Sequence, residues 1–128
     1  MKSIKIGMLG CGVVGGSVAR ELANSGADLA ARAGAKLELT KVAVRNLSKR
    51  DGVSDSILTT DAESVVTDPE ISLVIEVMGG IEPARELILK AIANGKSVVT
   101  ANKALLASHG ADLYNAAEKA GVDLYYEA

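Results

Sequence analysis

Residues 10–15 read Gly10-Cys11-Gly12-Val13-Val14-Gly15 and directly follow a short apolar run at residues 4–9. They also open a segment in which apolar residues recur with the spacing of one helix face. A G-x-G-x-x-G pattern between a strand and a helix is typical of a dinucleotide-binding turn. There the first glycine permits a tight turn, the second lets the backbone approach a pyrophosphate, and the third lets the helix pack on the strand. We therefore expect residues 10–15 to bind a pyrophosphate at a helix N-terminus, with an ordinary glycine turn as the alternative in a chain of 13 glycines.

The composition fits a single α/β domain over residues 1–128. Hydrophobic residues make up 48% of the chain but aromatic residues only 2%, so the core must be aliphatic, which suits a sheet covered by helices. The net charge of −2 gives no reason to expect a nucleic acid or a membrane surface as partner, and a small molecule is expected instead. The single cysteine, the lack of a charged leader and the lack of a long apolar run predict a soluble, cytoplasmic protein.

Strand and helix patterns alternate along the chain. Strands are predicted at residues 4–9, 37–44, 57–59, 73–77, 97–100 and 122–126. Helices are predicted from Gly15 onward, after an N-cap at Asp61, at 82–94 and at 113–120, with a helical turn at 104–107. Residues 27–35 are alanine-rich and fit either an extension of the first helix or a separate turn. The alternation predicts a doubly wound, parallel α/β sheet of six strands in the order 3-2-1-4-5-6, with helices on both faces.

Ligands of such a sheet bind beyond the carboxyl ends of the strands, near the point where the strand order reverses. This rule selects the loops that follow the predicted strands. The candidates for cofactor binding are Gly10, Cys11, Gly12, Val13, Val14, Gly15, Arg45, Lys49, Met78, Gly79, Thr100 and Lys103.

Arg45 is the most informative of these candidates. In NAD-binding sheets a carboxylate at the end of the second strand bonds the ribose hydroxyls, whereas here a guanidinium takes that place. A guanidinium can pair with a 2′-phosphate, and Lys49 and Arg50 add positive charge nearby. The sequence therefore favours NADP over NAD as cofactor, with solvated loop charges as the alternative interpretation.

Lys103 and Glu76 each have two interpretations. Lys103 follows the fifth predicted strand, where it can donate a hydrogen bond or a proton to a substrate oxygen, or be an ordinary solvated lysine. Glu76 lies inside an apolar strand, where an unpaired carboxylate is costly. Pairing with a polar partner across the sheet is therefore favoured over an orientation into the cofactor cleft.

Other reactive side chains have simpler predicted roles. Cys11 is expected to be a small filler in the glycine turn, and His109 to lie in a loop or at the start of a helix. The chain has no metal-ligand spacing and no nucleophile elbow, and residues 10–15 lack the Gly-Lys-Ser/Thr ending of a P-loop.

Several blocks of the sequence resemble the N-terminal cofactor domain of homoserine dehydrogenase. The most specific blocks are IEVMGGIEPA at residues 75–84 and VVTANKALLA at residues 98–107. Residues 7–16, 42–46 and 121–128 also match, so the resemblance covers essentially the whole chain.

The resemblance implies an oxidoreductase that interconverts L-aspartate 4-semialdehyde and L-homoserine with NAD(P)H, on the route to threonine and methionine. It also implies that Lys103 lies between cofactor and substrate, and that Glu127 begins a loop holding a monovalent cation such as sodium. The chain departs from the family by stopping at Ala128, without the substrate-binding and dimer-forming domain. We therefore expect a fragment of a homodimeric enzyme that binds NADP(H) but does not turn over alone.

Two other functions stay open at the level of sequence. One is a self-standing dinucleotide-sensing module without catalysis. The other is a different semialdehyde or aldehyde dehydrogenase, which would need a catalytic cysteine in a later domain.

Overall fold

The computed structural model describes residues 3–11, 17, 34, 36–45, 47, 53 and 55–126. The predicted helix after the glycine turn and the alanine-rich stretch at 27–35 lie outside these residues, apart from Ser17 and Gly34. Gly12 to Gly15, Lys49 and Glu127 also lie outside them, so the roles assigned to these residues stay predictions.

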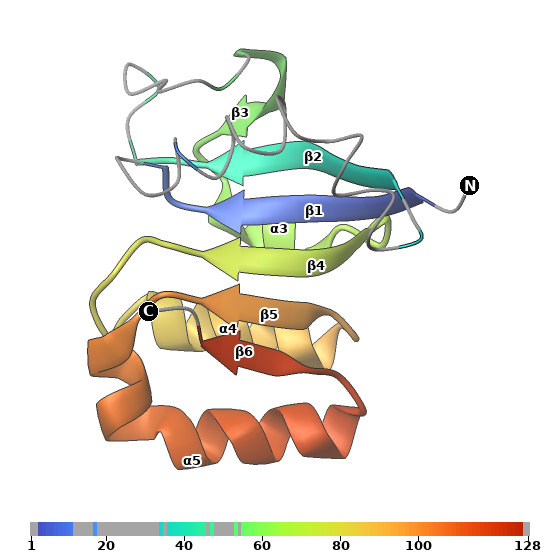
Figure 1. The fold of residues 1–128 in the computed structure, drawn as a ribbon. Coiled ribbons are helices and arrows are strands. Elements are labelled where there is room, and N and C mark those ends of the chain that lie inside the picture. The colour runs from blue at the N-terminus through green and yellow to red at the C-terminus, as the bar shows by residue number, and fades with distance from the viewer. Residues whose placement is uncertain are drawn as a thin grey trace.

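A parallel sheet of six strands forms the centre of the fold, and in Figure 1 all its arrowheads point the same way. The strands are β1 (Ser3–Leu9), β2 (Lys36–Ala43), β3 (Leu58–Thr59), β4 (Ile71–Glu76), β5 (Ser97–Thr100) and β6 (Leu124–Tyr126). Their order is β3-β2-β1-β4-β5-β6, which confirms the predicted doubly wound topology. β4 begins earlier than predicted, because Ile71 already pairs with Lys5 of β1.

The described helical segments are η1 (Asp55–Ile57), α3 (Ala62–Thr67), α4 (Ala84–Ala93) and α5 (Lys103–Ala120). α3 begins as predicted, because the Asp61 carboxylate accepts a 3.3 Å hydrogen bond from the Ser64 N–H. Gly121 ends α5 in the left-handed conformation, at φ 71°. Both helix boundaries therefore follow from cap residues that were visible in the sequence.

The prediction of a separate turn at 104–107 and a later helix at 113–120 is wrong. α5 runs without a break from Lys103 to Ala120, so His109 lies inside a helix rather than in a loop or at a helix start. A glycine inside a helix costs only about 1 kcal/mol. The burial of Leu105 and Leu113 on either side of Gly110 offsets that cost and keeps the helix continuous.

The core divides between the two faces of the sheet. On one face, Leu9, Val74 and Val98 pack with residues of α3, α4 and α5, and Figure 1 shows α3 and α4 behind the sheet. On the other face, Met8 and Val42 belong to a second buried cluster. Met8 and Leu9 are neighbours in β1 but belong to different clusters, as expected because successive side chains of a strand point to opposite faces. The helix predicted after the glycine turn lies outside the described residues, so the side chains that it would add to the core are not described.

Lys96 is a buried lysine at the amino end of β5, with 2% of its surface exposed. Its ammonium donates hydrogen bonds to the carbonyl oxygens of Asp68 and Ile71, the latter at 2.6 Å. Burial lowers the pKa of Lys96 below its ordinary value, because a desolvated ammonium is disfavoured. Lys96 thus ties the turn before β4 to β5, at the edge of the sheet opposite to the predicted site.

Candidate functional site

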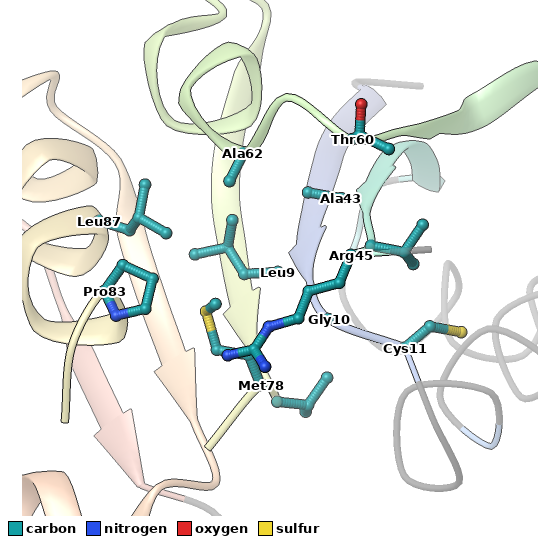
Figure 2. Close-up of a pocket in the computed structure, with 12 residues that line it drawn as sticks. Leu9, Gly10, Cys11, Ala43, Arg45, Thr60, Ala62, Met78, Pro83 and Leu87 are labelled. Atoms are coloured by element: carbon teal, nitrogen blue, oxygen red, sulfur yellow. The ribbon is translucent and has the colours of Figure 1, made fainter. Parts of the chain in front are cut away.

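A cavity of about 400 Å³ opens at the carboxyl ends of β1, β2 and β4. In Figure 2, Pro83 and Leu87 lie on one side of it and Ala43 and Arg45 on the other, with Leu9 between them. The residues lining the cavity are Leu9, Gly10, Cys11, Ala43, Val44, Arg45, Thr60, Ala62, Val77, Met78, Pro83 and Leu87. The described part of this wall is therefore mostly apolar, and Arg45 is its one cationic side chain.

Gly10 begins the glycine turn between two neighbouring strands. Its N–H donates a 2.8 Å hydrogen bond to the Ala43 carbonyl, and its φ is +89°. A Cβ at this position would lie 2.9 Å from the Met78 Cα, which is closer than real Cβ atoms come. Only glycine fits here, because both the backbone conformation and the approach of Met78 exclude a side chain. The requirement for glycine expected at this position is thus observed at Gly10.

Cys11 packs in the second core cluster, beside Met8 and Val42, with 6% of its surface exposed. It also contributes to the cavity wall. This position agrees with the expectation that Cys11 is a small filler of the turn.

Arg45 is exposed just beyond the end of β2. Figure 2 shows its guanidinium extending toward Met78, so that the side chain crosses one side of the cavity. No carboxylate in the described ranges forms an ion pair with it. None of these described carboxylates therefore competes with an anion that enters the cavity for the guanidinium.

Glu76 is fully buried at the carboxyl end of β4. Its Oε1 accepts a 2.5 Å hydrogen bond from the Thr100 hydroxyl, and its Oε2 accepts bonds from the Met78 N–H (2.9 Å) and the Gly79 N–H (3.1 Å). Thr100 is also the register partner of Glu76 in the neighbouring β5. The interpretation of Glu76 as paired across the sheet is therefore confirmed, and the orientation into the cleft is not observed.

Asn102 is buried and is not among the predicted site residues. Its Oδ1 accepts a 3.1 Å hydrogen bond from the Leu105 N–H, and its Nδ2 donates a 2.6 Å bond to the Gly80 carbonyl. An Asn placed just before a helix is a cap signal that could have been read from the sequence. Its hydrogen bond to the Gly80 carbonyl could not have been read from the sequence, because Gly80 lies in another loop.

Lys103 is the exposed first residue of α5 and follows Asn102 directly. Neither Lys103 nor Thr100 lines the cavity near Arg45, and Thr100 is fully buried against Glu76. The structure therefore brings Arg45, Met78 and the start of the glycine turn together, and places Lys103 on the β5 side of the same edge.

No group of three or more His, Cys, Asp or Glu side chains that could hold a metal ion occurs among the residues that the structure describes. Glu127, the residue that the resemblance links to a cation, lies beyond them. No described helix is long and apolar enough to cross a membrane.

A parallel sheet in this order, a glycine turn after its first strand and a cavity at its carboxyl edge define a dinucleotide-binding domain of the Rossmann class. The groups present also fit such a cofactor. At Gly10 the backbone leaves a space that a Cβ would fill, and beside it lie an apolar wall and a guanidinium that pairs with no described carboxylate.

Comparison with known proteins identifies the family. The family model described as "Homoserine dehydrogenase, NAD binding domain" matches residues 10–127. This chain therefore belongs to the homoserine dehydrogenase family, and a nicotinamide dinucleotide is the cofactor of the matched domain.

Individual relatives agree with this assignment. Homoserine dehydrogenase of Mycobacterium tuberculosis is 50% identical over 127 residues, which are 99% of this chain and 29% of that protein. The Corynebacterium glutamicum enzyme is 49% identical, over 98% of this chain and 28% of that protein. A crystal structure of a homoserine dehydrogenase from Thiobacillus denitrificans superposes with a TM-score of 0.94 at 46% identity, over 99% of this chain and 30% of that one. The chain thus spans under a third of the length of these relatives.

Proposed function

We propose that residues 1–128 form the cofactor-binding domain of a cytoplasmic homoserine dehydrogenase, which interconverts L-aspartate 4-semialdehyde and L-homoserine. The match of residues 10–127 to the family, with the cavity at the carboxyl edge of the sheet, is the observation that carries this proposal. The residues that bind substrate and form a homodimer belong, in this proposal, to the part of the relatives' length that this chain does not span.

The cavity fits the adenosine half of the dinucleotide. It lies over β1, β2 and β4, on the side of the sheet where the second strand of a Rossmann domain contacts the ribose. Leu9, Pro83 and Leu87 offer apolar surface to a flat base. The pyrophosphate then extends toward the glycine turn, and the nicotinamide lies on the β5 side of the edge.

Arg45 favours NADP over NAD. Arg45 follows the end of β2, where a carboxylate would otherwise bond the ribose hydroxyls, and its guanidinium has no ion-pair partner in the part of the chain that is described. A bidentate bond to a 2′-phosphate would supply that partner, and Lys49 would add charge.

Lys103 is the proposed catalytic residue of this domain. When bound, the nicotinamide ring supplies or accepts the hydride. Lys103 starts α5 with its side chain exposed, on the side of the sheet assigned to the nicotinamide. Its ammonium would hold a proton at the substrate oxygen while the hydride moves.

The other predicted site residues would have supporting roles. Met78 and Gly79 would contact the dinucleotide, and Thr100 would support their loop through Glu76. Glu127 would begin a site for a monovalent cation such as sodium.

The test combines binding with turnover. NADPH is titrated calorimetrically into the 128-residue chain, and the full-length protein is assayed for homoserine oxidation and for aspartate semialdehyde reduction. We expect the chain to bind NADPH without turnover and the full-length protein to catalyse both directions. A full-length protein that binds NADPH but converts neither substrate would contradict the proposal and favour a dinucleotide-sensing module.

A further inference from the structure

We infer that Glu76 and Asn102 are positioning residues that join the loop after β4 to the loop after β5 and thereby fix the place of Lys103. The catalytic consequence of this inference rests on the proposed role of Lys103. We call the contacts that join these two loops the junction. The junction is observed within the chain, so it can be present even if the proposed role of Lys103 is wrong.

The Glu76 carboxylate is the centre of the junction. It is fully buried and accepts one hydrogen bond from Thr100 and two from the loop amides of Met78 and Gly79. A buried carboxylate is tolerated when such donors satisfy it, and bonds to an ionised acceptor are stronger than neutral ones. The single carboxylate of Glu76 thus binds both the last residue of β5 and the loop that follows β4.

The loop after β4 presents its amides to Glu76 and not to a ligand. Gly79 and Gly80 both have φ of +76°, and a Cβ at either position would meet nothing within 4 Å. Glycine is therefore required here by backbone conformation and not by lack of space. Since the N–H groups of Met78 and Gly79 are engaged by Glu76, this loop differs from a phosphate-binding nest, whose N–H groups face the anion. The proposed contacts of Met78 and Gly79 with a dinucleotide would therefore use atoms other than these amides, and Met78 is the one of the two that lines the cavity.

Asn102 closes the junction from the other loop. Its backbone N–H donates a 3.0 Å bond to the Thr100 hydroxyl, while its side chain both caps α5 and bonds the Gly80 carbonyl. Lys103 is the next residue, so its backbone is held by the same set of contacts. A shift of the Met78–Gly80 loop would therefore be transmitted to the start of α5.

The junction is separate from the adenosine side of the site. Neither Glu76, Thr100 nor Asn102 lines the cavity beside Arg45. Disturbing the junction should therefore misplace Lys103 while leaving most of the dinucleotide contacts intact. Turnover is expected to fall much more than cofactor affinity.

Amide hydrogen exchange in the 128-residue chain, followed by NMR without cofactor, tests the junction directly. Thr100→Val removes the hydroxyl and keeps the shape of the side chain, whereas Thr100→Ser keeps the hydroxyl. We expect exchange at Met78 and Gly79 to be about tenfold faster in Thr100→Val and within about twofold of wild type in Thr100→Ser. Val74 and Ile75 of β4 serve as internal controls and should not change. Unchanged exchange at Met78 and Gly79 in Thr100→Val would overturn the inference.

A second variant tests the coupling to Lys103 even where Thr100→Val fails to fold. Asn102→Asp keeps an oxygen that can cap α5 but loses the donor to the Gly80 carbonyl. In the full-length enzyme we expect kcat to fall about tenfold or more while the Kd for NADPH stays within about threefold. Equal loss in both quantities, or no loss in kcat, would overturn the positioning role. A wild-type enzyme without homoserine dehydrogenase activity would instead refute the proposed function and leave the exchange result standing.

Discussion

Gly10 and Met78 approach so closely that a Cβ on Gly10 would lie 2.9 Å from the Met78 Cα. This approach brings Gly10, directly after β1, against the loop after β4, at the point where the strand order of the sheet reverses. The same two segments are also joined by a 2.9 Å hydrogen bond that the Val77 N–H donates to the Leu9 carbonyl. The two loops that border the cavity are thus held together by backbone contact.

Replacing Gly10 with alanine should destabilise the chain by about 2–4 kcal/mol, because it combines a strained positive φ with overpacking against Met78. Gly95→Ala is a matched control, since Gly95 has φ +77° but its Cβ would meet nothing within 4 Å. Urea denaturation of both variants separates the two costs. Equal losses of stability would show that the approach of Met78 has no energetic weight.

Lys96 should make the stability of the chain depend on alkaline pH. Burial lowers its pKa in the folded state, so between that lowered value and its ordinary 10.5 the unfolded chain binds more protons than the folded one. Stability contributed by Lys96 therefore rises with pH across that window and is constant below it. We expect the free energy of unfolding of wild type, relative to Lys96→Met, to increase between neutral and alkaline pH in urea titrations. A difference that stays constant with pH would contradict the effect of burial on Lys96.

Lys103→Ala should impair turnover more than cofactor binding. In the full-length enzyme we expect kcat to fall by about a hundredfold or more, because a positioned proton donor typically contributes that much. The Kd for NADPH should change by less than about threefold, since Lys103 does not line the cavity beside Arg45. Lys119→Ala, an exposed lysine at the other end of α5, is the control and should behave as wild type. Parallel loss of kcat and affinity would reduce Lys103 to a cofactor contact.

Much of the fold was predictable because local signals agreed with the topology. Apolar runs marked the strands, Asp61 marked the start of α3 and Gly121 the end of α5, and alternation of strands and helices fixed the strand order. The continuity of α5 was not predictable, because Gly110 weakens the local helix pattern and the burial of Leu105 and Leu113 depends on tertiary packing.

The candidate site shows the same division. Gly10 and Arg45 could be selected from their positions after predicted strands, and the structure places both at one cavity. The need of Glu76 for a partner was also predictable from its apolar surroundings. The three hydrogen bonds that Glu76 accepts from Thr100, Met78 and Gly79 could not be predicted, because they depend on how separate loops meet in space.

The central claim is that this edge of the sheet binds NADP through Arg45. Calorimetric titration of NADPH and NADH into wild type and into Arg45→Ala tests it most directly, because a charge-assisted bond to the 2′-phosphate is absent from NADH. We expect wild type to bind NADPH about tenfold or more tightly than NADH, and Arg45→Ala to lose most of that preference while keeping its affinity for NADH. Equal or tighter binding of NADH by wild type, or an unchanged preference in Arg45→Ala, would contradict this assignment of Arg45.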